Sequence, residues 1–117
     1  MEKKLRVKSK QDFQKVISSK KSLANDSFVI YYLKNEYPDP RFGISASKKV
    51  GGAVTRVKVR RQIRAMIWDL LKQGIIEKLD YVVIVRKGFL KKNYHQNEEE
   101  LSKLFKKIGG ITNAKKD

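Results

Sequence analysis

Apolar side chains recur with the period of an amphipathic helix in two parts of the chain. The first part follows Ser9, whose hydroxyl can cap a helical turn, and has apolar residues at i, i+3 and i+4: Phe13, Val16 and Ile17. The second directly follows Gly51-Gly52. Its apolar face consists of Val59, Ile63, Met66, Ile67 and Leu70. We therefore predict a short helix over about residues 9–17 and a long helix over 53–72.

Three other stretches have the pattern of strands. Residues 28–33 and 81–85 are β-branched and aromatic almost without interruption, and the second stretch is apolar enough for the centre of a sheet. Residues 42–47 alternate after a turn at residues 38–40, which favours a hairpin with the first strand. Because Tyr31 and Tyr32 are adjacent in a strand, they are expected on opposite faces of the sheet.

The C-terminal part predicts a third helix and a tail. Asn97 can cap this helix, and the acidic run 98–100 lies in its first turn, where the helix dipole favours negative charge. Its apolar stripe is Leu101, Leu104, Phe105 and Ile108. Gly109-Gly110 is expected to end it. One domain is therefore expected over residues 1–111, followed by a disordered basic tail over 112–117.

Composition restricts the class of protein further. The 117 residues carry 28 Lys+Arg against 12 Asp+Glu, a net charge of +16, and are 40% hydrophobic. This length and apolar content suit one small core. Cysteine is absent and His95, placed here in a loop, is the single histidine, so neither a thiolate metal site nor a conventional triad is expected. No apolar run approaches the ~20 residues of a membrane span, and no signal peptide is recognisable, so a cytoplasmic protein is expected.

The positive charge is concentrated in a segment without acids. Between Pro40 and Trp68 there are eight cations and no Asp or Glu. Arginine is scarce, seven residues against 21 lysines, yet four of the seven lie within residues 56–64. A guanidinium group binds phosphate through two donors and stacks on bases, so this segment favours contact with nucleic acid. The candidate RNA-binding residues are Lys48, Lys49, Arg56, Lys58, Arg60, Arg61 and Arg64.

A solvated helix face laced with ion pairs is the alternative for these cations. It is disfavoured because no acid stands three or four positions away across the first half of the helix. No pair of carboxylates and no nucleophile with a base partner stands out in the chain, so any enzyme activity is expected to reside in a partner.

The segment FGISASKKVGGAVTRVKVRRQIR, residues 42–64, resembles the signature of the protein subunit of bacterial ribonuclease P. Residues 12–16 and 22–25 match that family at similar spacings, and the resemblance covers about residues 5–108. It implies a single-domain α+β sandwich of a four-stranded mixed sheet and three helices, with a left-handed βαβ crossover. The residue patterns by themselves predict three strands and the usual right-handed connection.

The resemblance also implies a function. The chain would be an RNA-binding subunit that assists a catalytic RNA in endonucleolytic removal of the 5′ leader from precursor tRNA. Hydrolysis would use Mg²⁺ on the RNA, with no cofactor, metal or catalytic residue on the protein and no protein partner. The cationic helix would contact the catalytic RNA, and the leader would lie against Phe13, Ile17 and Tyr31. A stand-alone basic RNA- or DNA-binding module, such as a ribosomal protein, is the alternative from another class.

The chain departs from that family's pattern at several positions. The arginine motif of that family normally begins Arg-Asn-Arg, whereas in this chain Val57 and Lys58 follow Arg56. Gly52 stands where an Asn is usual, and Asp26 where an Arg is usual. Ile17 occupies a position that is often aromatic, so plain apolar contact replaces stacking there.

Overall fold

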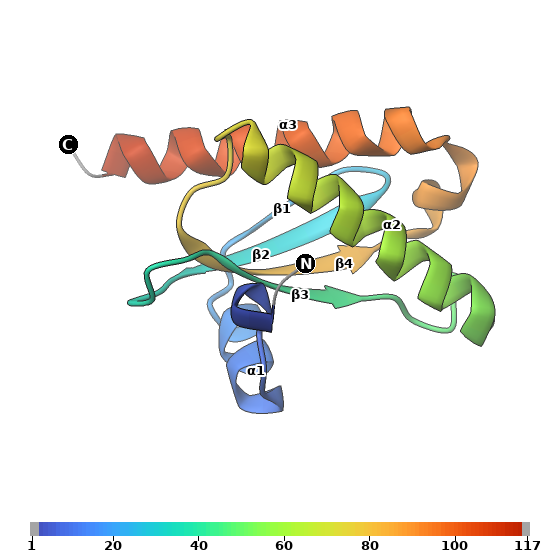
Figure 1. The fold of residues 1–117 in the computed structure, drawn as a ribbon, viewed down its shortest axis with the longest axis horizontal. Helices are drawn as coiled ribbons and strands as arrows, with labels where there is room; N and C mark the ends of the chain where they lie inside the picture. Colours follow the sequence, from blue (N-terminus) through green and yellow to red (C-terminus); the bar gives the residue numbers. More distant parts are fainter. Residues whose placement is uncertain (1–2, 116–117) are drawn as a thin grey trace.

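The two helices predicted in the first half of the chain are present. In the computed structural model, which describes residues 3–115, α1 spans Lys10–Ser18 and α2 spans Ala53–Lys72 (Figure 1). A short 3-10 turn, η1 (Lys3–Leu5), precedes them. The Ser9 hydroxyl accepts a hydrogen bond from the Asp12 amide at 3.0 Å and so caps α1. All five apolar residues expected on the inner face of α2 are buried.

Four strands form one mixed sheet in the order β1-β2-β4-β3. They span Ser22–Ala24, Phe28–Lys34, Arg41–Ser45 and Leu79–Val85, numbered β1 to β4 along the chain. β2 pairs antiparallel with β1 and with β4, whereas β3 pairs parallel with β4. The predicted hairpin between residues 28–33 and 42–47 is therefore wrong. β4, almost wholly apolar and buried at six of its seven positions, lies between these two strands, in the central position expected for it.

The connection between the parallel strands β3 and β4 runs through α2. In Figure 1 both strands point to the right, β4 lies above β3, and α2 passes in front of the sheet. This arrangement is a left-handed crossover, as the family resemblance implied and contrary to the general preference.

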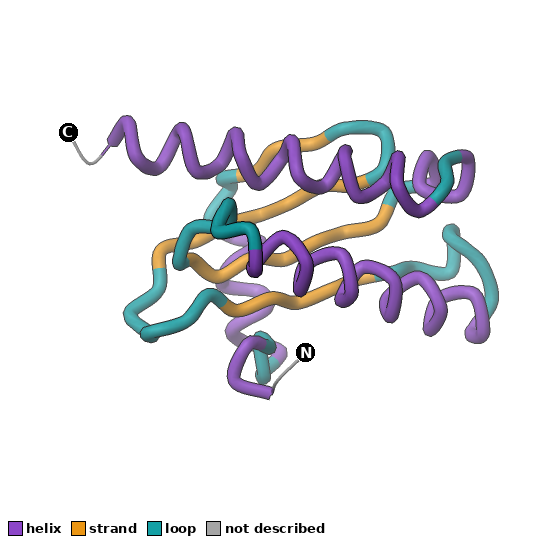
Figure 2. Tube along the Cα trace, turned by 45° about the horizontal axis from the view of Figure 1, so that its top comes forward, coloured by secondary structure: helices purple, strands orange, loops and turns teal. Residues whose placement is uncertain are grey.

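The sheet separates two layers of helices. α2 and α3 (Tyr94–Lys115) cover one face, and α1 lies on the other (Figures 1 and 2). The main core lies under α2 and α3, where the rings of Phe42 and Tyr81 stack at 5.3 Å and the ring of Phe105 meets both edge-on. The Tyr81 hydroxyl donates to the Glu77 carbonyl at 2.7 Å, and burial raises its pKa above the usual value.

α3 differs from the sequence prediction at both ends. It begins at Tyr94, so His95 is exposed in a helical turn rather than in a loop. Asn97 does not cap it, because this buried side chain accepts a hydrogen bond from the Ser27 hydroxyl and donates one to the Phe89 carbonyl. Through these two hydrogen bonds Asn97 and Ser27 help to hold the neighbouring 3-10 turn, η2 (Lys87–Lys91), against the sheet. The four apolar stripe residues are buried as expected.

The predicted end of this helix at Gly109-Gly110 is also wrong. α3 continues through both glycines to Lys115. Gly109 is buried, and a Cβ on it would lie 3.4 Å from Glu77 Cγ, in ordinary contact with the segment before β4. The helix thus includes residues 112–115, where a disordered tail was expected, and residues 116–117 lie outside the described residues. No helix within the described part of the chain is long and apolar enough to cross a membrane.

Candidate RNA-binding surface

The cations of α2 divide into two groups. Arg56, Arg60 and Arg64 recur every fourth residue and are half-buried along the flank of the helix, where they form what we call the arginine row. Lys58 and Arg61 are exposed and face away from the sheet. The helix therefore presents a row of partly held guanidinium groups next to two freely solvated cations.

The guanidinium groups of the arginine row repel one another and lack acidic partners among the described residues. Burial, helped by the nearby charges of Arg6 and Arg60, lowers the pKa of Arg64 below its usual value. The Nε atom of Arg56 is buried and makes no hydrogen bond within residues 3–115. None of the ion pairs among the described residues involves a cation of α2. Because arginine stays charged at neutral pH, an anion bound here would relieve repulsion between like charges.

Arg41 belongs to the acid-free segment of the sequence but not to this surface. Its guanidinium is buried against Asp80, with Nε–Oδ1 and Nη2–Oδ2 distances of 2.9 and 2.6 Å. The Asp12 carboxylate lies 3.6 Å from Nη1, and the ring of Tyr37 stacks on the guanidinium at 3.9 Å. The hydrogen bond to Asp80 raises the pKa of Arg41 further. This arginine is structural, so the eight cations of the segment do not act as one group.

A hollow of 180 Å³ at the β3 edge joins the arginine row to α1. Arg64 from α2 and Phe13 from α1 both line it, together with Arg6 of the N-terminal segment and Gly43 of β3. The N-terminal segment is held there by a hydrogen bond from the Val7 amide to the Phe42 carbonyl at 3.0 Å. Arg6 was not predicted from the sequence, because an isolated cation near the start of a basic chain carries no pattern of its own.

The three predicted leader-binding residues lie on the same face of the sheet as α1. Tyr31 pairs with Val82, and Val82 pairs with Gly43, so the three form a row across β2, β4 and β3. Phe13 covers one end of this row, since a Cβ on Gly43 would lie 2.9 Å from the Phe13 ring. Tyr31 lies at the other end, about 10 Å away at two strand spacings.

α1 crosses the strands from β3 toward β2. The C-terminal end of α1 is held to β2, because the hydroxyl of its C-cap, Ser19, donates a hydrogen bond to the Tyr32 carbonyl at 3.0 Å. Ile17, in the last turn of the helix, therefore lies on the β2 side. Phe13, Ile17 and Tyr31 are all half-buried, whereas Tyr32 is part of the core on the opposite face. The expected separation of the two tyrosines is confirmed. The structure thus provides an apolar and aromatic floor whose β3 end adjoins two arginines.

Lys48 and Lys49 are exposed in the turn that connects β3 to α2. The Lys49 amide donates to the Ser47 hydroxyl at 3.3 Å, which tightens this turn. Neither lysine lines the hollow beside Phe13, but Lys49 lines a second, larger one on the other side of the turn. Lys48 and Lys49 therefore do not share the cavity lined by Phe13, and their predicted contact with RNA stays a prediction.

Comparison with known proteins decides the family. The family model for ribonuclease P matches residues 1–109. The chain belongs to the ribonuclease P protein family. It is 44% identical over 111 residues to the ribonuclease P protein component of Streptococcus agalactiae, covering 95% of this chain and all of the relative. It is also 44% identical over 98 residues to that of Mesoplasma florum, covering 84% and 89% of the two chains.

Solved ribonuclease P proteins share the fold. The 2.0 Å structure from Staphylococcus aureus has a TM-score of 0.79 at 34% identity and covers 89% of this chain and 94% of its own. The structure from Thermotoga maritima has a TM-score of 0.77 at 33% identity and covers 87% and 96%. The resemblance inferred from residues 42–64 is confirmed. The chain is a protein subunit of a ribonucleoprotein endoribonuclease of tRNA maturation, and its partner is the RNA of ribonuclease P.

Two departures from the usual ribonuclease P motif lie on the exposed side of α2. Val57 is 46% exposed among the cations, and with Val54, Lys58 and Arg61 it lines a shallow hollow of 480 Å³. Gly52 forms the N-cap of α2 without a side-chain hydrogen bond. An apolar patch therefore interrupts the cationic face near its start.

Trp68 extends the same face toward the C-terminal half of α2. Its ring is 39% exposed, and the Lys72 ammonium lies 5.6 Å from the ring centroid. It stands four residues after Arg64 and seven after Arg61, so the three share one side of the helix. Trp68 was not predicted from the sequence as a binding residue, although an exposed tryptophan beside arginines has the chemistry to stack on a base.

Proposed function

We propose that this subunit binds the catalytic RNA of ribonuclease P through α2 and the 5′ leader of precursor tRNA through the sheet face beside α1. The observation that carries the proposal is the hollow lined by Arg6, Arg64 and Phe13. It joins phosphate-binding groups to an aromatic ring that a base can stack on. In this proposal the protein works in the cytoplasm, and the Mg²⁺ ions that drive hydrolysis are held by the RNA.

The contact with catalytic RNA is electrostatic in its main part. Arg56, Arg60 and Arg64 stand on one flank with no acid paired to them among the described residues, and Lys58 and Arg61 extend the charge outward. Neutralising several phosphates releases counterions, so affinity falls steeply as salt rises. The half-buried positions of the arginine row restrict its rotamers, which lowers the entropy lost on binding.

The leader contact depends on stacking and shape. Single-stranded nucleotides would lie along the row from Tyr31 to Gly43, with bases on Tyr31 and Phe13 and apolar contact at Ile17. One base–aromatic stack contributes ~1–3 kcal/mol, which is about tenfold in affinity or more. Mature tRNA lacks the leader and gains nothing from these residues.

Reconstitution with the catalytic RNA tests both parts. Replacing Arg60 and Arg64 together by Ala should weaken binding to the catalytic RNA and reduce the slope of log affinity against log salt by about 1–2. Lys106 and Lys107, both exposed on α3, provide a matched control when replaced by Ala, because the net charge falls by the same amount. An unchanged slope in the arginine variant would exclude the arginine row from the RNA contact.

The leader contact has its own readout. Tyr31→Ala should weaken the affinity of the holoenzyme for precursor tRNA about tenfold and leave its affinity for mature tRNA unchanged. Circular dichroism of the variant checks that the sheet is intact. Equal losses for both tRNA forms would make Tyr31 a structural residue. Leader removal by the protein alone, without RNA, would contradict the assignment of the chemistry to the RNA.

A further inference from the structure

A second cationic cavity lies at the end of the sheet opposite the β2–β3 turn. It measures 590 Å³ and is lined by three segments that are distant in sequence: the turn before β2, the turn before α2, and η2. The lining includes five cations and one acid: Lys49, Arg86, Lys87, Lys91, Lys92 and Asp26. We call this cavity the lysine pocket. None of its η2 cations was singled out from the sequence, because they are ordinary residues of a lysine-rich chain.

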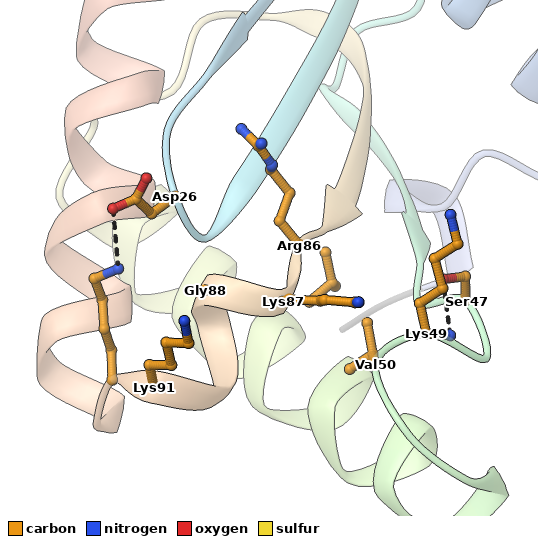
Figure 3. Close-up of a pocket in the computed structure, with 10 residues that line it drawn as sticks. Asp26, Ser47, Lys49, Val50, Arg86, Lys87, Gly88 and Lys91 are labelled. Atoms are coloured by element: carbon orange, nitrogen blue, oxygen red, sulfur yellow. Dashed lines mark hydrogen bonds and ion pairs between the residues drawn. The ribbon is translucent and has the colours of Figure 1, made fainter.

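Two of the five cations are already engaged. Lys92 pairs with Asp26, the single lining acid, at 3.8 Å, and Arg86 donates to the Asn25 carbonyl at 2.8 Å. Lys49, Lys87 and Lys91 form no ion pair within residues 3–115. Figure 3 shows Lys87 reaching from η2 across the space toward the turn that carries Lys49, while Arg86 points to the other side. Three ammonium groups thus border one cavity without a counterion from the described chain.

The wall that carries Lys87 and Lys91 is fixed by its packing. A Cβ on Gly88 would overlap the Asp26 carbonyl, so η2 lies directly against the turn before β2. The Arg86 amide donates to the Ser27 carbonyl at 2.9 Å, and buried Asn97 donates to the Phe89 carbonyl at 2.9 Å. The positions of the lysine backbones are therefore set before any ligand binds, which reduces the ordering cost of binding.

We propose that the lysine pocket binds a phosphate group of an RNA backbone and is a second anchoring point beside the arginine row. The floor of the pocket includes Val50 and Val85, both buried, which suits a sugar placed beside the bound phosphate. Lys49 and Val50 lie in the turn that leads into α2, so the pocket adjoins along the chain the start of the helix assigned to RNA. The inference rests on the proposed function in one respect, namely that α2 is the surface that binds the catalytic RNA.

The same phosphate chemistry is offered by the catalytic RNA and by the leader of precursor tRNA. Binding is therefore measured separately for the catalytic RNA alone, and for the holoenzyme with mature tRNA and with precursors of increasing leader length. The test variant is Lys87→Gln with Lys91→Gln, and the control is Lys106→Gln with Lys107→Gln on α3, which changes the net charge equally. All four lysines are exposed, so both variants should fold, and thermal melting checks this.

The test variant should lose about tenfold in affinity for one of the two RNAs, and the salt slope for that RNA should fall by about 1. The control should lose far less. A loss confined to the catalytic RNA assigns the phosphate to it, and a loss that appears only above a certain leader length assigns it to the leader. Lys87→Arg with Lys91→Arg keeps the charge and should keep the affinity.

The proposal is overturned if the test variant binds every RNA as the control does. Measuring Arg60→Ala with Arg64→Ala in parallel separates this failure from a failure of the proposed function. If the arginine variant binds weakly and the lysine variant binds normally, only the role of the lysine pocket in RNA binding is excluded. If both variants bind normally, the role of the arginine row is excluded as well.

Discussion

The buried pair of Arg41 and Asp80 offers the sharpest test of how this fold is held together. The carboxylate accepts two hydrogen bonds from the guanidinium, at 2.9 and 2.6 Å, and one from the Asn35 amide at 2.8 Å. The two charged side chains are only 9% and 8% exposed. Replacing Asp80 by Asn keeps the shape but removes the negative charge, so the buried Arg41 cation keeps one carboxylate nearby among the described residues, that of Asp12 at 3.6 Å.

The expected loss is large. Breaking a buried pair by removing one partner costs about 3–5 kcal/mol, because the remaining charge is uncompensated. A domain of this size has a total unfolding free energy of about 5–15 kcal/mol. With a urea dependence of about 2 kcal/mol per molar, Asp80→Asn should lower the urea midpoint by about 2 M. Circular dichroism during urea unfolding measures this shift.

Two further variants identify the cause. Asp26→Asn removes a carboxylate that is 88% exposed and pairs with Lys92 at 3.8 Å, so it should change stability by less than about 1 kcal/mol. Replacing Arg41 by Met and Asp80 by Leu together removes both charges and should be more stable than Asp80→Asn alone. A loss of less than about 1 kcal/mol in unfolding free energy for Asp80→Asn would contradict this expectation. So would a double variant whose loss equals the sum of the losses of Arg41→Met and Asp80→Leu measured singly.

Three other predictions follow from particular contacts. Gly88→Ala brings a Cβ onto the Asp26 carbonyl and should lower stability by about 1–3 kcal/mol, seen as a melting temperature reduced by several degrees, whereas an unchanged melting temperature would mean that η2 is loosely packed. Val57→Asn exchanges an exposed apolar group on the cationic face for an amide and should strengthen binding to the catalytic RNA by about 0.5–1.5 kcal/mol without altering the urea midpoint; equal or weaker binding would place the RNA elsewhere. Trp68 is the single tryptophan, so its fluorescence should change as catalytic RNA is titrated, and a constant signal would show that the RNA does not reach this half of α2.

Signals that act within a few residues were readable from the sequence. The Ser9 cap, the bounds of α2 and its buried face agree with the structure, since a capping hydrogen bond and a 3.6-residue period involve only neighbouring residues. The cationic segment was likewise visible, because charge and arginine content do not depend on the fold. The family followed from residues 42–64 for the same reason: its motif is continuous along the chain.

Only the tertiary structure decided which segments meet. β3 pairs with β4 rather than with β2. In this order β4, the most apolar strand, lies between β2 and β3 and is paired along both edges. This pairing depends on residues about 40 positions apart in the chain. Helix α3 passes through Gly109-Gly110 despite the low helix propensity of glycine, and the buried Gly109 lies beside Glu77, which is distant in sequence. In the sequence Arg41 is one of eight cations with nothing to distinguish it. Its structural role depends on the hydrogen bonds to Asp80, which is distant in the chain.

The lysine pocket and the hollow beside Phe13 belong to this second class. Each takes its lining from segments that are separate in sequence, so no local pattern marks them. What the sequence determined by itself was the kind of ligand, through the charge and arginine content of the chain. The places where that ligand can be held were decided by packing, because a cavity exists only where the backbones of distant segments are brought to fixed positions.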